Sequence, residues 1–178
     1  MPHNSIQQMK KLDLPLQRDL FLRSLIRELA GTLQELVGLE EAEGYISIVG
    51  QNIGEWINQT YKEKLDIDQL SNAQVAAVLV DLKARIQGNF ELVEFNHEKM
   101  VFSNDKCPFE DKVLDRPCMC MMTSNVFGSI SADNLGYAKV ELKKTIANRD
   151  GECHVVVYTS RTEASESAEG REYFGLDE

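Results

Sequence analysis

The sequence predicts an α+β fold in which N-terminal helices pack with a small antiparallel sheet and one further helix lies between strands. Apolar residues in the first half recur at spacings of three and four, as in amphipathic helices. The second half contains short runs rich in valine and aromatic residues, as in strands. Helices followed by strands are typical of α+β domains.

Three helices are expected before residue 90. The first covers residues 14–37 and stops at Gly38. Its apolar stripe, expected to face the core, consists of Leu22, Leu25, Ile26, Leu29, Leu33 and Leu36. The second covers residues 40–64, with a stripe made of Tyr45, Val49, Ile53, Trp56, Ile57 and Tyr61.

Two glycines interrupt the second helix one turn apart, Gly50 and Gly54. Each costs about 1 kcal/mol in a helix interior. Either another helix approaches closely at this point, or the helix has a local kink. A capping-box pattern at Ser71 and Gln74 then opens a third helix that runs to about Gln87. Its inward residues are expected to be Val75, Val78, Leu79, Leu82 and Ile86.

The remaining elements are shorter. Residues 90–95 and 99–103 are expected to form a hairpin around the turn 96–98, and residues 104–117 a loop. A helix is expected at 119–132, and strands at 137–145 and 153–159. We therefore predict a mobile leader (1–13), a single α+β sensory or regulatory domain (14–160) and an acidic tail (161–178), which its Glu/Ser-rich composition predicts to be disordered.

Charge and hydropathy exclude some functions. The net charge of the 178-residue chain is −10, and it has no basic run longer than two residues, so direct nucleic-acid binding is not expected. The sequence has no run of about 18 apolar residues, so a transmembrane helix is not expected. Residues 1–13 lack the apolar core of a secretory signal. We expect a cytoplasmic location.

The four cysteines, Cys107, Cys118, Cys120 and Cys153, are the main candidates for chemistry. Their spacing is not that of a zinc finger. Each falls at the edge of an expected element, and a helix N-terminus would favour thiolates at Cys118 or Cys120. The sequence alone leaves open a metal or redox cluster and four inert, buried cysteines.

Catalytic motifs for phosphate, dinucleotide, serine-hydrolase or zinc-protease chemistry are not found in the sequence. A nucleophilic cysteine would need a histidine base, and none can be assigned. We therefore expect no enzymatic activity and name no catalytic residue.

Several motifs occur in a fixed order between residues 90 and 158: Cys107-Pro108-Phe109, the segment 120–128 (CMMTSNVFG), the segment 136–140 (GYAKV) and the segment 150–153 (DGEC). Together they resemble the methanogen output domain family, which is similar to the 4-vinyl reductase sensor domains. The resemblance implies a signalling module, in a group where related domains bind small molecules and several use cysteines for metal binding or redox switching. Cys107, Cys120 and Cys153 match the pattern, whereas Cys118 lies outside it and Glu110 departs from it.

The leading hypothesis is a signal-transduction sensor that relays to a protein partner through its helical face. Its cysteine cluster would hold zinc or an iron–sulfur centre, with Cys107, Cys120 and Cys153 as ligands and Cys118 as a candidate fourth, or would act as a thiol redox switch. The alternative is an adaptor with structural cysteines that binds a small apolar ligand, and a redox enzyme ranks third. A homodimer is expected, because Leu14, Leu16, Leu20 and Phe21 add apolar surface to the first helix.

Overall fold

A computed structural model describes residues 2–175 of the chain. Its longer helices are α1 (Pro2–Met9), α2 (Arg18–Val37), α3 (Leu39–Leu65), α4 (Asn72–Arg85) and α5 (Met121–Leu135), with a short α6 (Glu163–Ser167). Its strands are β1 (Phe90–Phe95), β2 (Lys99–Asn104), β3 (Tyr137–Lys144), β4 (Cys153–Tyr158) and β5 (Arg171–Phe174). The predicted α+β fold is confirmed, with one helix, α5, between strands.

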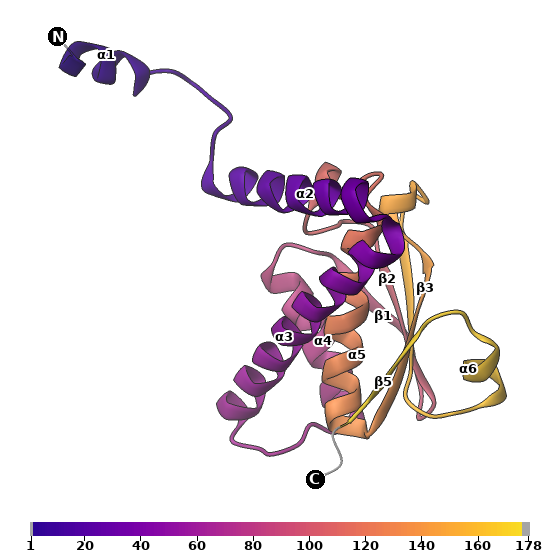
Figure 1. The fold of residues 1–178 in the computed structure, drawn as a ribbon. Coiled ribbons are helices and arrows are strands. Elements are labelled where there is room, and N and C mark those ends of the chain that lie inside the picture. The colour runs from indigo at the N-terminus through magenta and orange to yellow at the C-terminus, as the bar shows by residue number, and fades with distance from the viewer. Residues whose placement is uncertain (1, 176–178) are drawn as a thin grey trace.

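The sheet is antiparallel throughout and has the strand order β1-β2-β4-β3-β5. Because β4 lies between β2 and β3, the last residue of β2, Asn104, pairs with the first residue of β4, Cys153. The loop after β2 and the turn before β4 therefore meet at one end of the sheet. Helices α2 to α5 lie on one side of it, while α1 stands away from the body (Figure 1).

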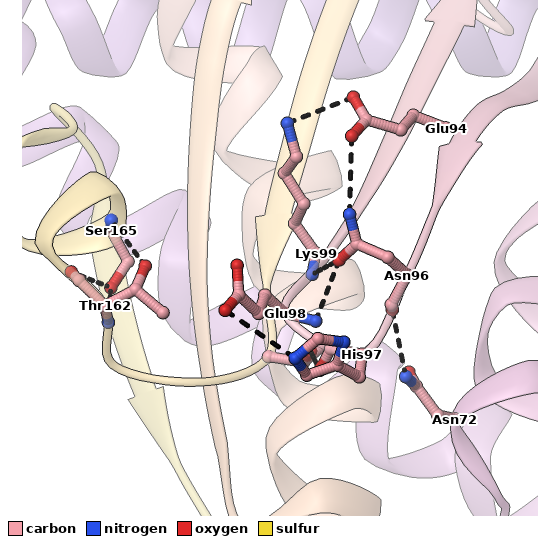
Figure 2. A network of polar contacts seen from close by, with 9 residues as sticks. Asn72, Glu94, Asn96, His97, Glu98, Lys99, Thr162 and Ser165 are labelled. Carbon is pink, nitrogen blue, oxygen red and sulfur yellow. Dashed lines mark hydrogen bonds and ion pairs between the residues drawn. The ribbon is translucent and has the colours of Figure 1, made fainter.

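The β1–β2 hairpin turns where the sequence predicts it. The side chain of Asn96 accepts hydrogen bonds from the backbone N–H groups of Glu98 (2.8 Å) and Lys99 (2.9 Å), which is a local Asx turn. Lys99 also pairs with Glu94 across the two strands (Figure 2). His97 lies at the tip with its side chain 88% exposed, so it belongs to the turn and not to a buried site.

The main core lies between the sheet and the helices α4 and α5. Phe127 of α5 packs edge-on against Phe90 and Phe102, with ring centroids 5.5 and 5.3 Å apart. The predicted capping box at Ser71 and Gln74 opens α4. Val75 and Leu79 face the core as predicted, whereas Ile86, also predicted inward, is 52% exposed.

The two glycines of α3 allow close contact with α5 and do not mark a kink at a free surface. A Cβ atom built on Gly50 would lie 2.8 Å from the Asn125 Cβ, and one on Gly54 would lie 3.2 Å from the Val126 Cα. The backbones of α3 and α5 can therefore approach only because both positions lack side chains.

The apolar stripe of α2 was expected to face the core, and for most of its residues this is wrong; most of the α3 stripe is exposed as well. Leu29 is 63% exposed and Trp56 is 66% exposed, whereas the buried residues of these helices include Ala30, Gly50 and Gly54. We call the exposed large side chains the outer helical face. It consists of Phe21, Leu22, Leu25, Ile26, Leu29, Leu36, Tyr45, Ile48, Val49, Ile53 and Trp56.

The tail that composition predicts to be disordered forms α6 and β5 over its described part, up to residue 175. Strand β5 pairs with the edge of β3, and the Tyr173 ring lies over Gly128, where a Cβ would approach within 2.2 Å of that ring. The Tyr173 hydroxyl is 2.9 Å from the Ser124 Oγ. An aromatic side chain above a glycine therefore anchors a segment whose average composition is polar.

Among the described residues, no helix is both long and apolar enough to cross a bilayer.

Candidate functional site

An enclosed cavity of about 70 Å³ lies where the loop after β2 meets the start of α5 and the start of β4. Cys107, Cys120 and Cys153 all line it, together with Lys83 and Asn104. We call this cavity, defined by these five residues, the thiol pocket. Its other walls are mainly apolar and include Ile86, Phe109, Met119, Met122 and Ile146.

Each cysteine reaches the pocket from a different segment. Cys107 follows β2, and the ring of Pro108 packs against Gly88, where a Cβ would lie only 3.1 Å from the Pro108 Cγ. Cys120 ends the short 3-10 helix η2 (Pro117–Cys120), directly before α5. Cys153 begins β4. The pocket therefore forms only in the folded chain.

Polar groups near the three sulfurs favour negative charge on them. The Cys153 Sγ accepts the Ile146 N–H at 3.5 Å. Backbone groups at Phe109 and Glu110 act to lower the pKa of Cys107, and the Thr145 side chain acts to lower that of Cys120. Donors of this kind stabilise negative charge on sulfur, the form that ligates metals and reacts with oxidants.

Burial acts in the opposite direction. It raises the pKa of the Cys107 thiol, and it raises the pKa of Cys120 to about 12, with the neighbouring Cys153 and Cys107 adding to the effect. The expected helix N-terminal activation of Cys120 is thus overcome by desolvation. As the pocket stands, the Cys107 and Cys120 thiols are neutral at pH 7.

Lys83 is the residue that sequence reasoning missed. It is 5% exposed, and its Nζ donates to the Thr123 Oγ1 at 2.8 Å and lies 5.0 Å from the centre of the Phe90 ring. Burial lowers the pKa of Lys83 to about 8, against the opposing influence of the three pocket cysteines. A sequence signal was available, because Lys83 follows Leu79 by four residues and so lies on the inward stripe of α4.

Cys118 does not line the pocket. It is fully buried, and its Sγ lies 3.9 Å from the Ala30 carbonyl oxygen of α2. It packs in a second small core with Ala42, Val113 and Met119. Burial raises the pKa of the Cys118 thiol, contrary to the thiolate expected at a helix start.

The residues of the thiol pocket suit a metal in their chemistry but not in their geometry. Soft thiolate ligands suit zinc or an iron–sulfur centre. In the described part of the chain, however, no three His, Cys, Asp or Glu side chains are grouped closely enough to hold an ion. The residues therefore have the right chemistry, but their present geometry is not a ready ligand set.

A second, more open hollow of about 420 Å³ lies between α3 and α4. Its walls include Trp56, Tyr61, Leu82 and Ile86, with Arg85 and Lys64 beside them. It continues the outer helical face at the Trp56 end.

A comparison with solved structures finds similarity to a trafficking protein particle complex subunit 3 from Naegleria fowleri, solved covalently bound to palmitic acid. The two share 13% sequence identity with a TM-score of 0.54, over 79% of this chain and 96% of that one. At this identity the likeness concerns the fold alone. A search of curated proteins finds no match.

The profile of the family described as Methanogen output domain 1 matches residues 25–158. The match covers most of the chain and includes α4, α5 and the three cysteines of the thiol pocket. It agrees with the resemblance carried by the motifs between residues 90 and 158. The chain therefore belongs to the methanogen output domain 1 family.

Proposed function

We propose that this protein is a cytoplasmic signal-transduction module, without enzymatic activity, in which the thiol pocket receives the signal and the outer helical face passes it to a protein partner. The observation that carries the proposal is the convergence of Cys107, Cys120 and Cys153 on one enclosed pocket. Membership of an output-domain family supports the regulatory role.

The proposed input is an agent that reacts with or binds to thiols, either an oxidant or a soft metal ion. Donors to the sulfurs and the Lys83 ammonium would stabilise thiolates once an input removes their protons. For an oxidant, two thiols form a disulfide and release two protons and two electrons, which a peroxide accepts as it is reduced to an alcohol or water. For a soft metal ion, the thiols would be the ligands and would lose their protons on binding.

The output follows from how the pocket is joined to the helices. Cys120 caps α5, and α5 packs against α3 through Gly50 and Gly54, so a shift at the start of α5 acts directly on α3. Through η2, Cys118 touches α2 at Ala30. Both helices of the outer helical face are therefore in contact with the segment that carries Cys120.

The outer helical face is the proposed contact for the partner. Its large apolar side chains are exposed over two adjacent helices, and contiguous patches of this kind are common at protein–protein interfaces. A second copy of the chain is the first partner to test, as expected from the apolar surface of the first helix.

The adaptor for an apolar ligand is the second candidate, and the hollow between α3 and α4 is the observation that favours it. The structural relative is covalently bound to palmitic acid. The thiol pocket here, at about 70 Å³, is far below the roughly 300 Å³ lower bound of drug-sized ligand pockets. An apolar ligand would therefore need the larger hollow.

The proposal is tested on anaerobically purified protein by metal analysis, a visible absorption spectrum and counting of reactive thiols before and after peroxide. Replacing Cys107, Cys120 or Cys153 by serine is expected to remove the bound metal or the oxidant response, whichever the wild type shows. Cys118→Ser is the control and should keep the metal or the oxidant response of the wild type. If the protein contains no metal, and peroxide changes neither its count of reactive thiols nor its partner binding, the proposal that the pocket responds to a metal or an oxidant is wrong.

A further inference from the structure

Two side chains in the thiol pocket have N–H groups without an acceptor among the described residues. The Asn104 side chain is 2% exposed, and its Nδ2 has no hydrogen-bond partner there. Lys83 donates one hydrogen bond, to Thr123, although an ammonium has three N–H groups, and it forms no ion pair with any described residue. Both residues line the same cavity.

The orientation of Asn104 is fixed by its neighbours. Its Oδ1 accepts the backbone N–H groups of Asn89 and Lys106, both at 3.1 Å. The amide cannot be flipped without turning its NH₂ group toward two other donors. The free end of the side chain is therefore a donor.

The pocket contains no acidic side chain to balance Lys83. Its lining consists of Lys83, Asn104, Thr123, the three cysteines and apolar residues. A buried cation without an anionic partner is costly, as is a buried donor without an acceptor. One anionic ligand with oxygen acceptors would remove both costs.

The size of the cavity limits that ligand. One water molecule occupies about 30 Å³ in the liquid, so about 70 Å³ accommodates only a few heavy atoms. Carboxylates and related planar oxyanions present two acceptor oxygens, which suits two donors on separate elements, α4 and the end of β2.

We propose that the thiol pocket binds a small oxyanion of up to about four heavy atoms, held by the Lys83 ammonium and the Asn104 side-chain amide. This deepens the proposed function, on which it rests for the role of the pocket as the input site. Such an anion would lie beside the three sulfurs and set the electrostatic field in which they lose or keep their protons.

The test is a titration of the full-length protein at pH 7 and constant ionic strength, followed by ¹H–¹⁵N NMR. The signals followed are the backbone amides of Cys107, Cys120 and Cys153, which every variant below keeps, and the Asn104 side-chain amide where it is present. Acetate and formate are the probes. Acetamide is the neutral match for acetate, and benzoate is the control for size. We expect saturable shifts with acetate or formate and none with acetamide or benzoate.

Variants locate the site. Lys83→Met should weaken acetate binding at least about tenfold, because it removes a charge-assisted hydrogen bond. Asn104→Asp keeps the oxygen that accepts from Asn89 and Lys106 but replaces the donor by a carboxylate, so it should abolish binding. Lys106→Met, an equal loss of charge at an exposed position, should change binding by less than about twofold.

The outcomes separate this inference from the proposed function. Equal shifts with acetate and acetamide, or binding that survives both Lys83→Met and Asn104→Asp, would overturn the anion site. If Lys83→Met does not fold, the folded Asn104→Asp variant decides alone. If the wild type binds none of the anions, while the cysteine variants lose its metal or its oxidant response, only the anion site is refuted.

Discussion

Helices α4 and α2 carry similar apolar stripes, and the fold uses them in opposite ways. In α4 the stripe lies against the sheet, and Val75 and Leu79 are fully buried. In α2 the small residues Ala30 and Gly31 face the body, while Leu25 and Leu29 face outward. Periodicity identifies the apolar side of a helix, but the topology decides what covers it. The covered stripe serves stability, and the uncovered one is available for association.

The largest expected difference between these helices is in stability. Leu79→Ala should lower the free energy of unfolding by about 2–5 kcal/mol, because it leaves a cavity in the main core. Leu29→Ala should change it by only about 0.5 kcal/mol, since the side chain is already 63% exposed. Urea denaturation measures both. Similar losses for the two variants would mean that the α2 stripe is covered in solution.

The contact of α3 with α5 can be tested with glycines of a single helix. Gly50→Ala should lower the free energy of unfolding by about 1–3 kcal/mol, because the new Cβ would lie 2.8 Å from the Asn125 Cβ. Gly44→Ala is the matched control, with nothing within 4 Å of its new Cβ. It should raise stability by roughly 0.5–1 kcal/mol. A stabilising Gly50→Ala would refute the close packing.

These elements show how far the sequence leads. The capping box at Ser71 and the hairpin at 96–98 were predictable, because each depends on local chemistry. For the glycine pair of α3 the sequence left a close helix contact and a kink open, and the structure has the contact. The exposed stripes of α2 and α3 were not, because the same pattern fits a core and an interface. Strand β5 was missed since composition averages over the tail, while Tyr173 and its slot at Gly128 decide its position.

The candidate site was partly predictable in the same sense. The motif pattern selected Cys107, Cys120 and Cys153 and set Cys118 apart, and the structure places only the first three around the thiol pocket. Asn104 carried no signal in the sequence, and Lys83 carried only its place on the inward stripe of α4. Their importance comes from the pairing of β2 with β4 and from the packing of α4, which a single sequence does not specify.

Lys83, on the inward side of α4, also makes the stability of the protein depend on pH. Its pKa falls from 10.5 to about 8 on folding because of burial, so the unfolded chain binds more protons between these values and stability rises with pH. From pH 8 to 9 the contribution of Lys83 alone should be a gain of about 1 kcal/mol. The raised pKa values of Cys107, Cys118 and Cys120 act in the opposite direction as the pH rises through about 9, the ordinary thiol value, since the folded state then keeps protons that the unfolded chain loses.

The control for this pH effect is Lys83→Met, in which the change in stability from pH 8 to pH 9 should be less favourable than in the wild type by about 1 kcal/mol, because only the opposing effect of the cysteines remains. The variant should also be more stable than the wild type at pH 7, because it no longer buries a charge. A variant that keeps the wild-type slope would show that another group titrates in this window.

The smallest effect on stability is expected on the exposed stripe of α2, and this stripe also gives the sharpest test of its difference from α4. Leu29→Arg should change the free energy of unfolding by less than about 0.5 kcal/mol, because the position is exposed. It should nevertheless reduce self-association, since a charge would enter the centre of an apolar interface. Val93→Arg is the matched control, because Val93 is 55% exposed on β1, away from the outer helical face. Light scattering over a range of concentrations should show dimers for the wild type and Val93→Arg, and mostly monomers for Leu29→Arg. Monomers throughout would exclude a second copy as the partner of this face, whereas dimers in all three proteins would place the dimer interface elsewhere.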